Sequence, residues 1–116
     1  LSALCGCVVA ATGSSCGITY LMGGGYGQAA AAVKNMIANL TGMICDGAKP
    51  SCAGKIAMAV EAGIMGCRMN AEGEKFLCGD GIVGEDADET ISNTGRVARE
   101  GMRATNDTII KIMIGD

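Results

Sequence analysis

The sequence has 116 residues, enough for one small domain with a single core, and a net charge of −3 from nine basic and twelve acidic residues. The basic residues are spread thinly and aromatic residues make up only 3% of the chain, which excludes the charged and stacking surfaces that nucleic-acid binding requires. No histidine occurs, so Ser-His-Asp groups, Cys-His groups and histidine-bearing zinc sites cannot be built from this chain alone.

The apolar composition predicts the fold class. Apolar residues make up 49% of the chain, yet there are one Phe, two Tyr and no Trp. The core must therefore consist of Ala, Ile, Leu, Val and the eight Met, and such small or flexible side chains favour closely packed helices. We expect an all-α fold, a single compact helical domain over residues 1–116 with glycine-rich loops. Because the chain does not begin with Met and starts within an apolar segment, we expect a piece of a longer protein.

The cysteine content indicates the redox environment. Seven cysteines at irregular spacing, with one left over from any complete pairing, argue against a secreted disulfide framework. We therefore expect a reducing, cytoplasmic location, where the thiols remain free to bind a metal.

Residues 1–33 carry no charge, which raises the question of a membrane helix. A spanning helix needs a run of roughly 18 or more apolar residues. Residues 12–15 (T-G-S-S) and the three glycines at 23–25 break this run into short pieces, and no cluster of Lys or Arg flanks it. We expect two helices buried inside a larger helical protein instead.

Residues 28–43 form the clearest predicted helix. Its apolar side chains recur at helical spacing, at Val33, Met36, Ile37, Leu40 and Ile44. The helix places Cys45 at its C-terminal end.

Residues 41–52 read T-G-M-I-C-D-G-A-K-P-S-C and predict a turn that holds two thiols. Gly47 permits a sharp turn, and Pro50 and Ser51 suit the start of a new helix. Cys52 then falls in the first turn of that helix, where the helix dipole stabilises a thiolate. The spacing of Cys45 and Cys52 does not by itself distinguish metal ligands from buried thiols.

The second half of the chain predicts further helices. Residues 52–70 show an apolar stripe that we expect to face the core, at Ala53, Ile56, Ala57, Val60, Ile64 and Cys67. Residues 72–85 contain four glycines and predict turns, with a short hairpin compatible with residues 76–83. Asp86 and Glu89 have the spacing of a capping box, followed by helices over residues 87–99 and 102–114 that Gly101 separates.

A resemblance extends this interpretation. Residues 35–53, N-M-I-A-N-L-T-G-M-I-C-D-G-A-K-P-S-C-A, resemble the C-terminal part of L-cysteine desulfidases, which belong to the superfamily of the iron-sulfur L-serine dehydratase alpha chain. The opening segment L-C-G-C-V-V-A-A-T-G-S-S-C-G also resembles that of this family, and the similarity covers nearly the whole chain.

The resemblance implies a site and a reaction. It places the family's three cluster cysteines at Cys5, Cys45 and Cys52, which would hold a 4Fe-4S cluster with one iron open. The implied reaction is β-elimination of L-cysteine to pyruvate, ammonia and sulfide, or of L-serine to pyruvate and ammonia. Asn39 and Lys49 are the candidates for orienting the substrate, although a capping amide and a surface lysine explain them equally well.

The resemblance also implies partners. The catalytic base and much of the substrate pocket would lie in an N-terminal portion, or in a partner subunit, outside this chain, so residues 1–116 alone should be inactive. Association with a second copy is a further expectation. Two other interpretations of the cysteines stay open, a structural zinc site and a helical packing module in which the thiols only fill the core.

Overall fold

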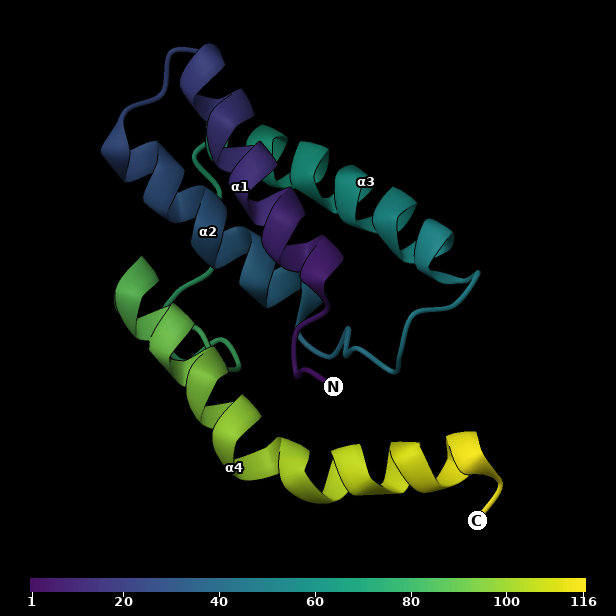
Figure 1. Cartoon of the computed structure of the whole chain (residues 1–116). Coiled ribbons are helices and arrows are strands. Elements are labelled where there is room, and N and C mark those ends of the chain that lie inside the picture. Colours follow the sequence, from purple (N-terminus) through teal and green to yellow (C-terminus); the bar gives the residue numbers. More distant parts are fainter.

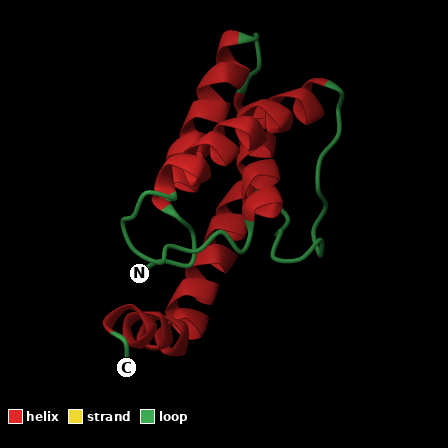
Figure 2. Ribbon diagram, turned by 90° about the vertical axis from the view of Figure 1, so that its right-hand side faces the viewer, coloured by secondary structure: helices red, strands yellow, loops and turns green.

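The computed structural model describes residues 1–116 and contains four helices and no strand (Figures 1 and 2). Helix α1 spans Gly6–Leu21, α2 spans Tyr26–Leu40, α3 spans Cys52–Ala71 and α4 spans Ala87–Ile114. The predicted all-α fold is confirmed. None of the helices combines the length and the apolar character needed to cross a membrane.

Helix α1 is continuous through residues 12–15, so the break predicted there is wrong. The hydroxyls of Thr12 and Ser14 donate back to the carbonyls of Val8 and Ala10, at 2.7 and 3.1 Å. Ser15 is fully buried and donates to the carbonyl of Gly63 in α3 at 3.1 Å. Packing against α3 thus overrides the weak helix propensity of this stretch. The second predicted break is confirmed, because residues 23–25 separate α1 from α2.

Helices α1, α2 and α3 form the core, in which small side chains allow close approach. Ala11, Met36, Ala59 and Ala62 pack together at its centre. A Cβ atom on Gly63 would lie 3.6 Å from the carbonyl oxygen of Ala11, so the backbones of α1 and α3 run close together. Met36 fills the remaining space and is fully buried.

Helix α3 has the predicted bounds, but Cys67 is the one member of the predicted stripe that is buried. The buried residues are the small ones, at Ala59, Ala62, Gly63, Gly66 and Cys67. The larger side chains of the predicted stripe point away from the core: Ile56, Val60 and Ile64 are 55%, 53% and 42% exposed. Both stripes repeat with a helical period, and α1 and α2 cover the one that permits the closer approach.

The segment between α3 and α4 forms turns, so the hairpin suggested for residues 76–83 is wrong. The Asp80 carboxylate accepts a hydrogen bond from the backbone N–H of Leu77 at 2.7 Å, and Gly79 N–H donates to the Val83 carbonyl at 3.1 Å. The Asn93 amide in α4 donates to the Ile82 carbonyl at 3.0 Å. Turns within the segment and the Asn93 side chain of α4 therefore hold these residues in place, and no strands pair here.

Helix α4 begins as predicted and continues further than predicted. Asp86 caps it by accepting a hydrogen bond from the Glu89 N–H at 2.8 Å. The helix runs through Gly101 without a break, although Figure 1 shows that it bends along its length. Its first half packs on α2, and its end reaches the cysteine turn, where a Cβ atom on Gly47 would lie 3.1 Å from Met113 Cε.

Candidate metal centre

Backbone hydrogen bonds bring the segments of two candidate ligands side by side. The N–H of Cys5 donates to the Met43 carbonyl at 2.8 Å, and the N–H of Cys45 donates to the Ser2 carbonyl at 2.9 Å. The residues before α1 therefore lie along the chain that leaves α2. Cys5 is the residue directly before α1, and Cys52 is the first residue of α3. Both thiols thus occupy helix N-termini, where a negative charge is stabilised.

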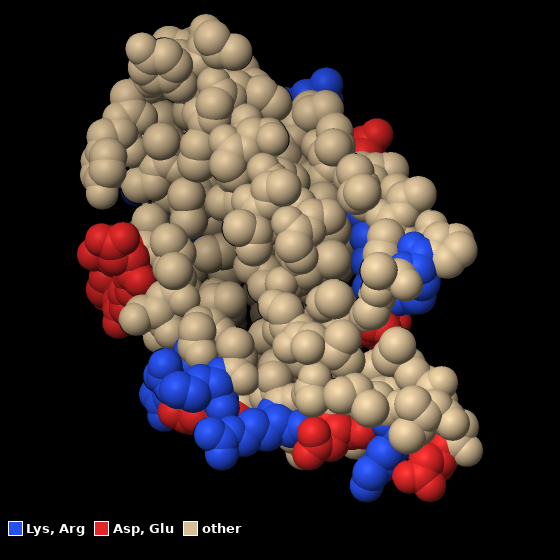
Figure 3. Space-filling view, in the orientation of Figure 1, with Lys and Arg blue, Asp and Glu red and all other residues tan.

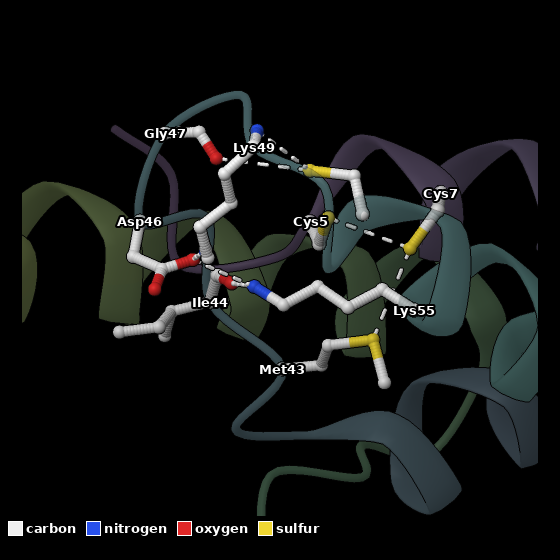
Figure 4. Close-up of polar contacts among 9 residues, drawn as sticks. Cys5, Cys7, Met43, Ile44, Asp46, Gly47, Lys49 and Lys55 are labelled. Carbon is white, nitrogen blue, oxygen red and sulfur yellow. Dashed lines mark hydrogen bonds and ion pairs between the residues drawn. The ribbon is translucent and has the colours of Figure 1, made fainter.

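Cys5 is buried and is paired most closely with Cys7. The Cys7 thiol donates to Cys5 Sγ at 3.4 Å and also contacts Met43 Sδ at 3.8 Å (Figure 4). A hydrogen bond from the backbone N–H of Cys7 lowers the pKa of the Cys5 thiol, and the positive charge of Lys55 contributes, against the opposing effect of burial. Burial raises the pKa of Cys7. Cys5 therefore has the stronger thiolate character of the two.

Cys52 receives a backbone hydrogen bond within the turn. The N–H of Lys49 donates to Cys52 Sγ at 3.4 Å, and the thiol donates to the Gly47 carbonyl at 3.7 Å. Backbone N–H groups that point at sulfur stabilise thiolate ligands. Gly47 adopts a φ of 101°, which a residue with a side chain rarely adopts, and this conformation closes the turn over the sulfur.

A lysine and a carboxylate that the sequence interpretation missed lie beside these thiols. Lys55 Nζ donates to Asp46 Oδ1 at 2.8 Å and to the Ile44 carbonyl at 3.0 Å, and Lys49 also forms an ion pair with Asp46 Oδ1. The two lysines hold the pKa of the Asp46 carboxyl well below its usual range. Asp46 raises the pKa of Lys55, and the thiolates of Cys5 and Cys52 raise it further. Figure 4 shows the Lys55 ammonium directed toward Asp46.

The spacing within α3 could have identified Lys55. It follows Cys52 by three residues in the first turn of the helix, and residues three apart share a helix face. Asp46 directly follows Cys45, but no sequence pattern predicts which lysine it pairs with.

The segments that carry the predicted ligands lie in one region, and no closed metal site is formed in this structure. No group of three or more His, Cys, Asp or Glu side chains is arranged to hold a metal ion, and all seven cysteines are free thiols. Cys45 is half-buried, and its neighbours Ile44 and Asp46 both contact Lys55. The donor set nevertheless suits an iron-sulfur cluster, because it offers thiols on three adjacent segments with N–H donors directed at two of them. The assignment of Cys5, Cys45 and Cys52 as ligands stays a prediction.

A surface depression of about 450 Å³ opens beside this region. It is lined by the backbone that leaves α2 and by polar side chains of Asn39, Thr41, Asp46 and Lys55. Asn39, a predicted substrate-orienting residue, lies on this wall and makes one weak contact with Met69 Sδ at 3.8 Å. Lys49, the other predicted residue, is not part of the lining, and its ammonium pairs with Asp46.

Cys78 lies on the exposed segment between α3 and α4, apart from the other thiols, and its chemistry gives a prediction. The Glu85 carboxylate raises the pKa of the Cys78 thiol, so less thiolate is present at a given pH. Glu85→Gln is therefore expected to speed alkylation of Cys78 by iodoacetamide at pH 7.5 and to shift its pH–rate profile to lower pH. Mass spectrometry of the Cys78 peptide measures this rate, with Glu74→Gln as the control. An unchanged profile would contradict the assignment.

Comparison with known proteins identifies the family. Residues 1–111 match the family described as serine dehydratase alpha chain. UPF0597 proteins from Bacteroides fragilis and Bacteroides thetaiotaomicron are 57% and 56% identical over 113 residues, which is 97% of this chain and 26% of each relative. A UPF0597 protein from Desulfitobacterium hafniense is 52% identical over 114 residues, 98% of this chain and 26% of that protein.

The chain thus spans about a quarter of the length of these curated relatives. No solved structure matches it. The family match covers the segments of all three candidate ligands and all four helices up to Lys111. The chain therefore belongs to the serine dehydratase alpha-chain family.

Proposed function

We propose that this chain is the cluster-binding part of an iron-sulfur lyase that catalyses β-elimination of L-cysteine to pyruvate, ammonia and sulfide. Cys5, Cys45 and Cys52 are the proposed ligands of a 4Fe-4S cluster. The observation that carries the proposal is the backbone pairing of residues 2–5 with 43–45, which brings two of these cysteines onto adjacent segments. L-Serine is a second candidate substrate, because the matched family is described as serine dehydratase.

The proposed chemistry divides between the cluster and the protein. A four-iron cluster held by three thiolates supplies an open iron that acts as a Lewis acid on the leaving sulfur or oxygen. This chain stabilises the thiolates with the N–H groups of Cys7 and Lys49 and with the charge of Lys55. The base that removes the α-proton is proposed to lie in the part of the protein outside residues 1–116. Loss of that proton and of the leaving group, followed by hydrolysis, gives pyruvate and ammonia.

The exposed apolar surface supports the proposal that further polypeptide packs on this chain. Only 18 of the 116 residues are buried, and the Cα atoms extend 16 Å in the shortest direction, so the helices are covered on few sides. The outward stripe of α3, Ile56, Val60 and Ile64, has the spacing of a buried face. Figure 3 shows charged side chains over α4 along the lower edge and at the left and right margins, and none at the centre of this face of the molecule.

We propose that the remaining polypeptide of a full-length protein, three-quarters of the length in the relatives, packs on this apolar surface. The alternative occupant is a second copy of the chain. In that case, replacing Ile56 and Val60 by Asp would change the oligomeric state. A cytoplasmic location completes the proposal, because seven free thiols and an open-iron cluster require a reducing environment.

Anaerobic reconstitution tests the proposed function. The full-length protein is incubated with iron and sulfide, and its visible charge-transfer absorbance and its iron and zinc contents are measured. Pyruvate formed from L-cysteine and from L-serine is then assayed, with sulfide as the second product of L-cysteine. Iron uptake with pyruvate from L-cysteine is the expected result. Pyruvate from L-serine alone would favour the second candidate, and bound zinc without iron uptake would overturn the cluster proposal.

A further inference from the structure

Lys55 retains hydrogen-bonding capacity at the edge of the depression. A lysine ammonium has three donors, and two of them are directed to the Asp46 carboxylate at 2.8 Å and to the Ile44 carbonyl at 3.0 Å. These two contacts fix the ammonium in place and leave the third donor free. The side chain is 22% exposed, so the remaining donor is accessible from the depression that Lys55 lines.

Asp46 retains a free acceptor beside it. Lys49 and Lys55 both bind the same oxygen, Oδ1, and no contact is made to Oδ2. The two lysines and one carboxylate together carry one excess positive charge. Asp46 and Lys55 therefore present a negative acceptor and a positive donor next to one another on the wall of the same depression.

This arrangement is complementary to a zwitterion. An α-amino acid carries an ammonium group and a carboxylate on one carbon, and each can pair with the group of opposite charge on the protein. Asn39 and Thr41 add neutral hydrogen-bonding groups to the wall. A dianionic phosphate fits less well, because a single lysine donor faces it and the Asp46 carboxylate lies beside that donor.

We propose that Asp46 and Lys55 form the binding subsite for the α-ammonium and α-carboxylate of the amino-acid substrate, with Lys55, in place of Lys49, as the carboxylate-binding residue. This inference rests on the proposed function and names the residues that recognise its substrate class. It places the substrate next to Met43 and the Cys5–Cys7 pair, since Met43 also lines the depression and contacts the Cys7 thiol.

Binding measurements on the full-length protein test the subsite without relying on turnover. Calorimetry compares the dissociation constant of L-serine with that of L-serinamide, which keeps the ammonium and lacks the carboxylate. The wild-type protein is expected to prefer L-serine. Lys55→Met should weaken L-serine binding by about 10- to 100-fold, the usual effect of losing a charge-assisted hydrogen bond, and should remove the preference for the carboxylate.

Three further variants complete the test. Lys55→Arg keeps the charge and should retain the preference for L-serine, while Lys49→Met should also retain it. Lys75→Met, on an exposed segment, serves as the control for removal of a positive charge. Helical circular dichroism and iron content show whether each variant is folded and loaded.

The outcomes separate this inference from the proposed function. If Lys55→Met keeps the preference for L-serine, or Lys49→Met loses it, the assignment to Lys55 is wrong even when the enzyme produces pyruvate. If L-serine binding depends on Lys55 but no pyruvate forms from either amino acid, the subsite stands and the lyase proposal falls. Failure of the wild-type protein to bind both L-serine and L-cysteine overturns the subsite.

Discussion

Replacement of Cys45 by serine is expected to abolish the iron-sulfur absorbance of the reconstituted full-length protein and its lyase activity. A serine hydroxyl stays protonated near neutral pH and binds iron poorly, so two thiolates would remain where three are proposed. Activity should fall by at least about 100-fold, because loss of a partner outside the ligand set already costs about 10- to 100-fold in metal sites. Iron content per protein and visible absorbance under anaerobic conditions measure the effect directly.

Cys78→Ser is the matched control for this variant. It makes the same chemical change at an exposed thiol on the segment between α3 and α4, away from the proposed centre. It should retain the absorbance and activity of the wild-type protein. Equal iron uptake by Cys45→Ser and wild-type protein would remove Cys45 from the ligand set. Cys7→Ser tests whether Cys7 or Cys5 is the ligand, since their Sγ atoms lie 3.4 Å apart. Loss of iron in this variant would identify Cys7 as a ligand.

The sequence predicted helix positions better than helix faces. The start of α3 at Cys52 follows from Pro50 and Ser51, and the start of α4 follows from Asp86, because these local signals act within a few residues. The predicted break at residues 12–15 failed, since Ser15 gains a buried hydrogen bond to α3 that no local pattern reveals. The break predicted at Gly101 failed for a different reason, because a single glycine weakens a long helix without ending it.

The buried face of α3 shows a second limit of prediction from the sequence. Ile56, Val60 and Ile64 form the more hydrophobic stripe, yet the stripe of Ala59, Ala62, Gly63 and Gly66 is the one covered. Periodicity locates apolar stripes but does not tell which neighbour covers each of them. The chain spans about a quarter of the length of its relatives. Under our proposal, the remaining polypeptide covers the exposed stripe of α3. Hydrophobicity alone therefore predicts burial of a face that these 116 residues leave exposed.

The sequence predicted which segments form the candidate site, but not which side chains contact one another there. The resemblance placed Cys5 and Cys45 on segments that backbone hydrogen bonds bring together, and Cys52 on the helix start whose Lys55 contacts Ile44 and Asp46. Lys49 was favoured because it is close to Cys45 in sequence, whereas the side chain on the depression wall belongs to Lys55, one helical turn into α3. Side-chain direction in a turn depends on backbone conformation, here the left-handed φ of Gly47, which sequence distance does not describe.

Met36→Ala is expected to produce the largest loss of stability in the core. Met36 is fully buried, packs with Ala11, Ala59 and Ala62, and its sulfur lies 3.6 Å from where a Cβ atom on Gly66 would be. Its core neighbours are alanines, and Gly63 and Gly66 also face it, so backbones would have to move for the core to refill the space. We therefore expect a loss of about 2–5 kcal/mol in the free energy of unfolding of this region, the range for truncating a buried methionine to alanine.

Hydrogen exchange of the full-length protein measures this change in peptides from α1, α2 and α3, because it reports on local opening even when other parts of the protein unfold separately. Met22→Ala is the control, since Met22 is 63% exposed at the end of α1 and its truncation leaves no cavity in the core. Equal effects of the two substitutions would mean that Met36 is not the side chain that fills the space between the three helices. A larger effect of Met36→Ala in α1 and α3 than in α4 would locate the cooperative unit in the three helices that support the cysteine turn.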